Sequence, residues 1–199
     1  MLAQMDDGVG RVLAALRENG LEENTLVLFL SDNGGPTREL TSSNAPLRGE
    51  KGQLLEGGIR IPFVVSWKDH VPAGREDPRM VSALDLYPTA LAAAEAPAVA
   101  NLDGVNLLPH LAASDNEAFR PRHYWRVGPQ AALREGDWKI YRSPAGKAWQ
   151  LFHLTEDPGE AHDLAAAHPD RVAALEAAWK KLDAEMISPL WGSAGKGSQ

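Results

Sequence analysis

The chain has 199 residues, with 20 lysines and arginines against 27 aspartates and glutamates, and its formal net charge is −7. This acidic balance, without a block of basic residues, argues against a nucleic-acid-binding surface. No stretch approaches the roughly 18 consecutive apolar residues of a membrane-spanning helix. Cysteine is absent, which excludes disulfides, thiolate nucleophiles and cysteine-ligated zinc. The first residues also lack the apolar core that is typical of a secretion signal.

The first elements alternate between helical and extended patterns. Apolar residues recur at three- and four-residue steps over residues 2–16, which predicts an amphipathic helix that ends at Asn19-Gly20. Residues 25–30 are β-branched and aliphatic without polar alternation. This is typical of a strand covered on both faces of a parallel sheet.

A second apolar run, over residues 59–67, follows a Gly-rich loop over residues 32–58. Residues 83–94 have a helical pattern, and Pro97 beyond them is a stop signal. The order of helix, strand, loop, strand and helix predicts an α/β fold. We therefore expect at least two parallel strands in this part of the chain.

The character of the sequence changes after about Asn116. Short aromatic and branched stretches alternate with turn signals, which predicts a small antiparallel meander, and Pro169 to Ile187 has the pattern of a final helix. The short stretches are Tyr124-Trp125, Ala131–Arg134, Trp138–Arg142 and Trp149–His153. We expect residues 1–115 to form the α/β part, residues 116–190 the antiparallel subdomain with its packing helix, and residues 191–199 a disordered tail.

The strand at residues 25–30 ends in a group of polar residues. Asp32 and Asn33 follow it after Ser31, and ligands of open α/β sheets bind beyond the carboxyl ends of strands. A carboxylate and an amide carbonyl are hard oxygen donors, which Ca²⁺ and Mg²⁺ prefer. Gly34 and Gly35 allow a sharp turn and leave room for a ligand. An ordinary turn explains the same four residues, so this motif alone leaves both interpretations open.

Lys51 lies in a loop that is rich in glycine and poor in bulky side chains. A lysine in such a loop can place its ammonium group against a bound oxyanion. Taken by itself, Lys51 is better explained as a solvated loop residue.

Taken together, the stretches resemble the sulfatase family, the formylglycine-dependent sulfuric ester hydrolases of the alkaline phosphatase superfamily. By this resemblance Asp32 and Asn33 supply two ligands to Ca²⁺, or alternatively Mg²⁺, and Lys51 contacts the sulfate group. The implied fold is the C-terminal part of an alkaline-phosphatase-like mixed or parallel sheet layer, followed by a small antiparallel sheet with a C-terminal helix. The matching segments, in chain order, are MDDGVGRVLAALRENGLEENT, LFLSDNGG, PLRGEKGQLLEGGIRIPFVV, VSALDLYPTALAAA, LDGVNLLPHL, REGDWKIYR and LFHLTEDPGEAHDLA.

The chain departs from the family at the nucleophile. The family makes formylglycine from the Cys or Ser of a C/S-x-P/A-x-R motif, and the nearest match here, Ser43 to Arg48, has its arginine one place too late. The chain thus resembles only the C-terminal portion of a family member, and we assign no catalytic residue. A sulfate ester is the expected substrate of the intact enzyme. We expect the isolated chain to be inactive, and to self-associate or pair with a missing N-terminal half.

Two other functions stay open. A phosphodiesterase or phosphonate monoester hydrolase of the same superfamily would use similar residues, although such relatives tend to have His where Asn33 stands. A non-catalytic chain that binds Ca²⁺ or a partner would explain the missing nucleophile motif. The sequence indicates neither the natural ester nor the cellular location.

Overall fold

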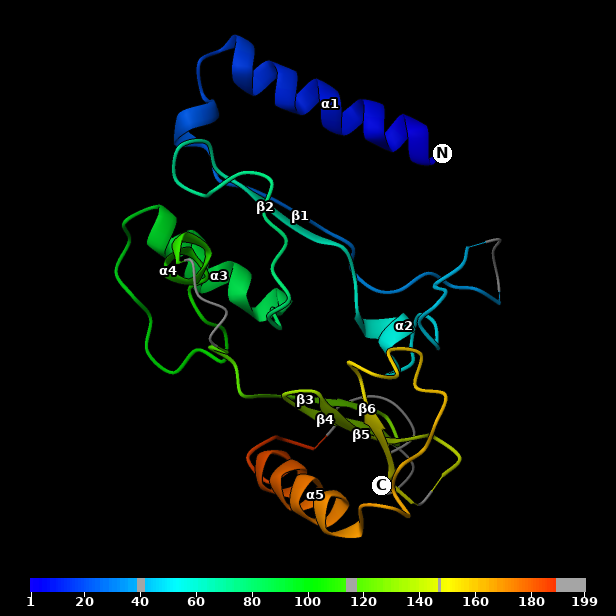
Figure 1. Cartoon of the computed structure of the whole chain (residues 1–199). Coiled ribbons are helices and arrows are strands. Elements are labelled where there is room, and N and C mark those ends of the chain that lie inside the picture. Colours follow the sequence, from blue (N-terminus) through cyan, green and yellow to red (C-terminus); the bar gives the residue numbers. More distant parts are fainter. Residues whose placement is uncertain (39–41, 114–117, 147, 189–199) are drawn as a thin grey trace, which may run out of the picture. The chain divides into compact units, whose positions relative to one another are not determined.

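The computed structural model describes residues 1–38, 42–113, 118–146 and 148–188. The chain forms two compact units (Figure 1). The first contains Met1–Leu30 and Phe63–Phe119, and the second contains Ser31–Pro62 and Arg120–Gln199. The predicted tail, residues 191–199, lies outside the described residues. The boundary predicted near residue 115 stays a prediction for the domains of the intact protein.

The first unit begins with a long helix, α1 (Leu2–Glu18), as the periodicity predicted. Gly20 follows it with φ 68°, a left-handed conformation that glycine adopts without steric cost. A short 3₁₀ turn, Glu22–Asn24, leads into strand β1 (Val27–Leu30), which pairs with β2 (Phe63–Ser66). Among the described residues, no helix has the length and apolar character needed to cross a membrane.

Strands β1 and β2 are antiparallel, so the prediction of two parallel strands is wrong for this pair. An uninterrupted apolar run reports burial and says nothing about strand direction, which is why the pattern misled. The strands are also less covered than the pattern suggested, since Phe29 is 38% and Val64 53% exposed. The second strand is shorter than residues 59–67, because Ile59 belongs to a helical turn and residues 60–62 connect that turn to the strand.

Three helical segments complete the first unit. The predicted helix over residues 83–94 is present as a 3₁₀ turn, Ala83–Asp85, that continues into α3 (Leu86–Ala93). A capping box between Ser82 and Asp85 starts it. The buried Asp85 carboxylate also accepts a hydrogen bond from the Val105 N–H at 2.8 Å. This bond ties the start of the helix to the chain that leads into α4 (Leu108–Ala112).

The second unit is built on a four-stranded antiparallel sheet, which confirms the predicted meander. Its strands occur in chain order across the sheet. Two-residue turns at 128–129 and 136–137 join the first three strands, and residues 143–149 lead into the fourth. The final helix is α5 (Pro169–Asp183), close to the predicted range. The strands are β3 (Arg122–Val127), β4 (Gln130–Glu135), β5 (Trp138–Arg142) and β6 (Gln150–His153).

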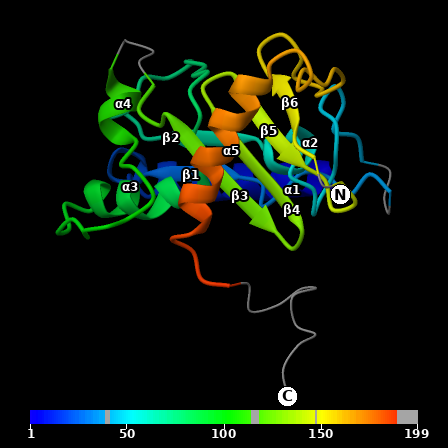
Figure 2. The ribbon, with the colours of Figure 1, turned by 90° about the horizontal axis from the view of Figure 1, so that it is seen from below.

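Both faces of this sheet are covered. Helix α5 lies across one face and buries Leu175 and Trp179 against it (Figure 2). The other face packs against Leu54 and Leu55, which immediately precede the short helix α2 (Glu56–Ile59). Alternate strand residues therefore point to different partners. On the α5 face lie Ala131, Leu133, Ile140 and Leu151, and on the face toward α2 lie Ala132, Tyr141 and Phe152.

We expect Ile140→Ala to lower the free energy of unfolding of the second unit by about 2–5 kcal/mol, because the truncation leaves a cavity beneath α5. Ile140 is fully buried. Urea unfolding followed by tryptophan fluorescence measures the change, since Trp149 and Trp179 lie in the same cluster. Val127→Ala, at a position that is 51% exposed, is the matched control and should change little. Equal losses in the two variants would contradict this description of the core.

Candidate functional site

The segment after β1 is held by direct contact between backbones. The Gly34 N–H donates to the Gly58 carbonyl oxygen at 3.0 Å. A Cβ atom at Gly34 would lie 1.8 Å from the Gly57 oxygen, and one at Gly58 would lie 2.2 Å from the Gln53 oxygen. Glycine is therefore required at both positions by close approach of the backbone. The turn at Gly34 and α2 are held together without any side chain between them.

Asn44 holds a second pair of segments together. Its Oδ1 accepts from the Gly35 N–H at 2.9 Å. Its Nδ2 donates to the carbonyl oxygens of Gly35 at 2.9 Å and Gly49 at 3.0 Å. One amide side chain thus replaces water at three backbone groups and fixes the loop beside the glycine turn.

Asp32 and Asn33 lie in the turn after the strand, as predicted. The Asp32 side chain is exposed, and its Oδ1 accepts from the Asn33 N–H at 3.0 Å. Asn33 is half-buried; its Nδ2 donates to the Gly34 carbonyl at 2.9 Å, and its own carbonyl accepts from the Ser31 hydroxyl at 2.8 Å. These bonds fix the turn through its backbone and orient the Asn33 amide.

Lys51 is brought to this turn by its backbone. The Lys51 N–H donates to the Gly35 carbonyl at 3.4 Å, and the side chain is exposed. The preceding residue, Glu50, is 9% exposed and accepts from the Thr37 hydroxyl at 2.7 Å and from the Arg38 N–H at 2.9 Å. These hydrogen bonds, with that from Thr37 the strongest, hold the pKa of the Glu50 carboxyl below its usual value. Glu50 therefore stays ionised and anchors the loop directly before Lys51.

The donors near the turn suit a hard cation but do not complete a site. Asp32 offers a carboxylate and Asn33 an amide, which is oxygen chemistry of the kind that Ca²⁺ takes. Ca²⁺ requires about six to eight oxygens. Within residues 1–38, 42–113, 118–146 and 148–188, no group of three His, Cys, Asp or Glu side chains could hold a metal ion. The pair therefore fits part of a Ca²⁺ site.

A buried ionic cluster lies next to α2. The Lys139 ammonium is fully buried; it donates to Glu56 Oε1 at 2.9 Å and lies 2.9 Å from Glu160 Oε1. The Glu56 N–H donates to Glu160 Oε2 at 2.6 Å, and Arg134 lies 4.0 Å from Glu56. Burial raises the pKa of the Glu160 carboxyl, and Lys139 opposes that rise. We name Glu56, Lys139 and Glu160 the buried triad.

Sequence reasoning missed the buried triad and Asn44. The signal for Lys139 was present, because strand alternation puts it on the same face as Tyr141, which is an unusual place for an unpaired charge. Glu160 lies directly after a turn signal, Asp157-Pro158-Gly159, and was therefore passed over as part of that turn. Nothing in the sequence indicated which residue of the loop over residues 32–58 would contact Lys139 or Glu160.

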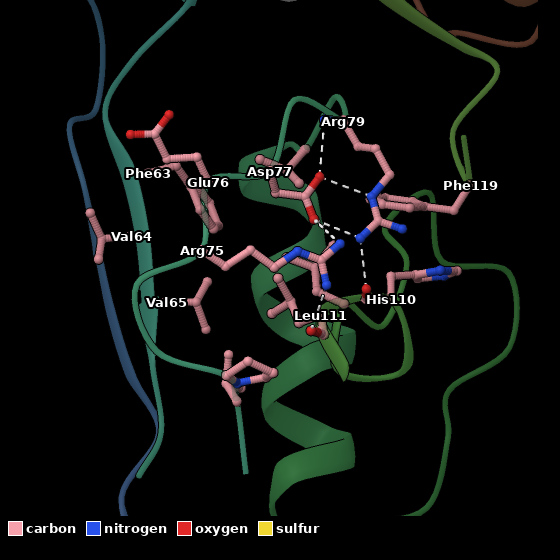
Figure 3. Close-up of a pocket in the computed structure, with 14 residues that line it drawn as sticks. Phe63, Val64, Val65, Arg75, Glu76, Asp77, Arg79, His110, Leu111 and Phe119 are labelled. Atoms are coloured by element: carbon pink, nitrogen blue, oxygen red, sulfur yellow. Dashed lines mark hydrogen bonds and ion pairs between the residues drawn. The ribbon is translucent and has the colours of Figure 1, made fainter. Parts of the chain in front are cut away.

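Each of the two units contains a hollow. In the second unit, a groove of about 430 Å³ runs beside the Lys51 loop and is lined by Arg38, Arg48, Glu50, Gln53, Tyr141 and Ser143, among others. In the first unit, a cavity of about 400 Å³ lies beside β2. Figure 3 shows Asp77 there between the guanidinium groups of Arg75 and Arg79. Asp32, Asn33 and Lys51 are among the lining residues of neither hollow, although Glu50 and Gln53 beside Lys51 line the groove.

Two family models match the chain. The model described as Sulfatase matches residues 1–96, and the model described as N-sulphoglucosamine sulphohydrolase, C-terminal, matches residues 50–186. The chain is 33% identical to steryl-sulfatase of Mus musculus over 98% of this chain and 41% of that protein. It is 30% identical to N-acetylgalactosamine-6-sulfatase of Homo sapiens over 86% of this chain and 40% of that protein. The chain thus spans about two fifths of the length of these relatives.

Solved structures show the same fold. The crystal structure of Ps i-CgsB has a TM-score of 0.86 and 35% identity, over 96% of this chain and 43% of that chain. The phosphonate monoester hydrolase of Agrobacterium radiobacter has a TM-score of 0.74 and 24% identity, over 94% of this chain and 40% of that one. Such likeness supports the expected alkaline-phosphatase-like α/β fold.

We expect Gly34→Ala to lower the free energy of unfolding of the second unit by about 1–3 kcal/mol, since the added methyl group overlaps the Gly57 backbone. Urea unfolding followed by tryptophan fluorescence measures the loss. Gly146→Ala is the control, because the close approach of its Cβ would be to the Ser143 hydroxyl at 2.7 Å, a side-chain end that can move, and its backbone contact, with the Ala148 oxygen, would be an ordinary 3.9 Å. A stable Gly34→Ala protein would show that the strand end and α2 do not make the described backbone contact.

Proposed function

Because this chain belongs to the sulfatase family, we propose that the protein hydrolyses sulfuric esters with Ca²⁺ as its metal ion. The observation that carries this proposal is the bond from the Lys51 N–H to the Gly35 carbonyl. It joins the loop of a candidate anion-binding lysine to the turn that holds two oxygen donors. A metal ion and an ammonium group at one strand end are what a sulfate group requires.

Asp32, Asn33 and Lys51 have different roles in this proposal. Asp32 and Asn33 would hold the Ca²⁺, which when bound supplies a positive charge to the sulfate oxygens. Lys51 would place its ammonium group against another sulfate oxygen and stabilise the negative charge that grows there as the ester bond breaks. The glycine contacts keep this region free of side-chain bulk. The nucleophile lies outside the residues to which we assign roles.

We propose that the groove beside the Lys51 loop takes the organic part of the ester. Glu50 and Gln53, on either side of Lys51, both line it, and Arg38, Arg48 and Ser143 add polar groups. Such a lining suits a saccharide with hydroxyl and anionic substituents better than an apolar ring system. The relative Ps i-CgsB was solved in complex with k-i-k-neocarrahexaose. A sulfated saccharide is therefore the substrate class to test first.

In the protein at its natural length, we expect Lys51→Ala to lower kcat for a chromogenic aryl sulfate by about 10²–10³-fold, the cost of removing one oxyanion-stabilising group. Lys68→Ala is the control, since Lys68 is an exposed lysine that pairs with Glu23. Steady-state kinetics measures both.

A phosphodiester and a phosphonate monoester are assayed in parallel. Faster turnover of either would replace the sulfate ester assignment with the alternative of the same superfamily. Absence of all three activities would favour a non-catalytic Ca²⁺-binding or partner-dependent chain.

We expect the isolated chain to bind Ca²⁺ weakly, with a Kd on the order of 10⁻⁴–10⁻³ M, because two protein ligands leave most positions to water. Titration calorimetry should detect this binding, and Asp32→Asn should weaken it at least about tenfold by removing the charged ligand. Asp6→Asn, a substitution in helix α1, should leave it unchanged. Binding that survives Asp32→Asn would rule out the assigned pair.

A further inference from the structure

We infer that Glu160 is a positioning residue that holds both ends of the segment Arg48–Glu56, and thereby places Lys51. Its carboxylate accepts from the Glu56 N–H at 2.6 Å, and its carbonyl oxygen accepts from Arg48 Nη1 at 2.5 Å. Lys51 lies between these two anchored positions. A single residue from a distant turn thus closes the loop that carries the candidate anion-binding lysine.

The buried triad makes this anchor specific. Lys139 comes from β5, and its ammonium group contacts carboxylates from α2 and from the turn after β6. Desolvation offsets much of the attraction in a buried ion pair, so such pairs contribute less to stability than to geometry. A shift of α2 along the sheet would remove Glu56, one of the two partners of the fully buried Lys139 charge. The cluster therefore selects one register of the loop against the sheet.

Backbone hydrogen bonds connect the two anchored ends of the segment with each other and form the turn around Lys51. The Gly57 N–H donates to the Arg48 carbonyl at 2.7 Å, which joins the two ends directly. The Gln53 N–H donates to the Glu50 carbonyl at 2.9 Å and forms the turn that contains Lys51. Displacement at Glu56 is transmitted through these bonds to the turn that contains Lys51.

The turn that presents Glu160 is itself held in an uncommon conformation. Glu160 has φ 53°, a left-handed backbone angle that costs energy for a residue with a side chain. Asp157 closes the turn, since its two carboxylate oxygens accept from the N–H groups of Ala161 and His162 at 3.0 and 2.8 Å. The turn therefore aims both the carbonyl and the carboxylate of Glu160 at the loop.

Hydrogen exchange on the 199-residue chain tests the anchor. We expect Glu160→Gln to accelerate exchange at the amides of residues 53–58 by about tenfold, while the amides of β4 and β5 keep their protection. Arg48→Gln changes an exposed residue and should loosen the same segment by about threefold without unfolding the chain. Glu156→Gln, on the same turn with a side chain that is 80% exposed, is the matched control and should change nothing. Uniform acceleration across the sheet, or none in the loop, would overturn the inference.

The link to Lys51 rests on the proposed function and is tested by kinetics on the protein at its natural length. Glu160→Gln should lower kcat for an aryl sulfate about tenfold when Lys51 is present, but less than about twofold in a Lys51→Ala background. Equal effects in the two backgrounds would show that Glu160 does not act through Lys51. If the unmodified protein has no sulfatase activity, the proposed function fails, and hydrogen exchange still decides whether Glu160 holds the loop.

Discussion

A fully buried lysine is the constraint on which the second unit depends. Taking an ammonium group out of water costs several kcal/mol, and only close counter-charges offset that cost. Lys139 obtains them from Glu56 and Glu160, which lie far from it and from each other in the sequence. The position of α2 follows from this requirement, because Glu56 is its first residue. The backbone contacts of Gly34 with Gly57 and Gly58 then hold the turn after β1 against α2.

Sequence reasoning was most successful where local pattern decides structure. The meander and α5 were predicted because alternation, turn residues and helical periodicity are each encoded within a few positions. Strand direction in the first unit was predicted wrongly, since the apolar run over residues 25–30 is compatible with either direction. The buried triad was missed for a different reason. Pairing between Lys139 and carboxylates in other segments is decided by the assembled fold, and no local spacing reports it.

The placement of the candidate residues was predicted from the sequence, but the bonds that support them were not, and their roles stay a prediction. The position of Asp32 and Asn33 after a strand, and the Gly-rich surroundings of Lys51, were readable because ligand sites at strand ends have a simple sequence pattern. The structure adds the bonds by which Asn44 and the Lys51 backbone gather these segments around Gly35. Asn44 gave no signal, because an asparagine in a polar loop is most often a turn residue. Support of this kind becomes visible only in three dimensions.

The division of the sheet into two faces has a consequence for how such a protein can evolve. Ile140 packs beneath α5, whereas its neighbours Lys139 and Tyr141 face the loop. Successive residues of β5 therefore belong to different sets of contacts. Substitutions beneath α5 can accumulate and compensate one another without disturbing the loop. Substitutions on the opposite face are more restricted, because the buried charge of Lys139 must keep the counter-charges of Glu56 and Glu160. Lineages should therefore diverge rapidly in one set of positions and slowly in the set that alternates with it.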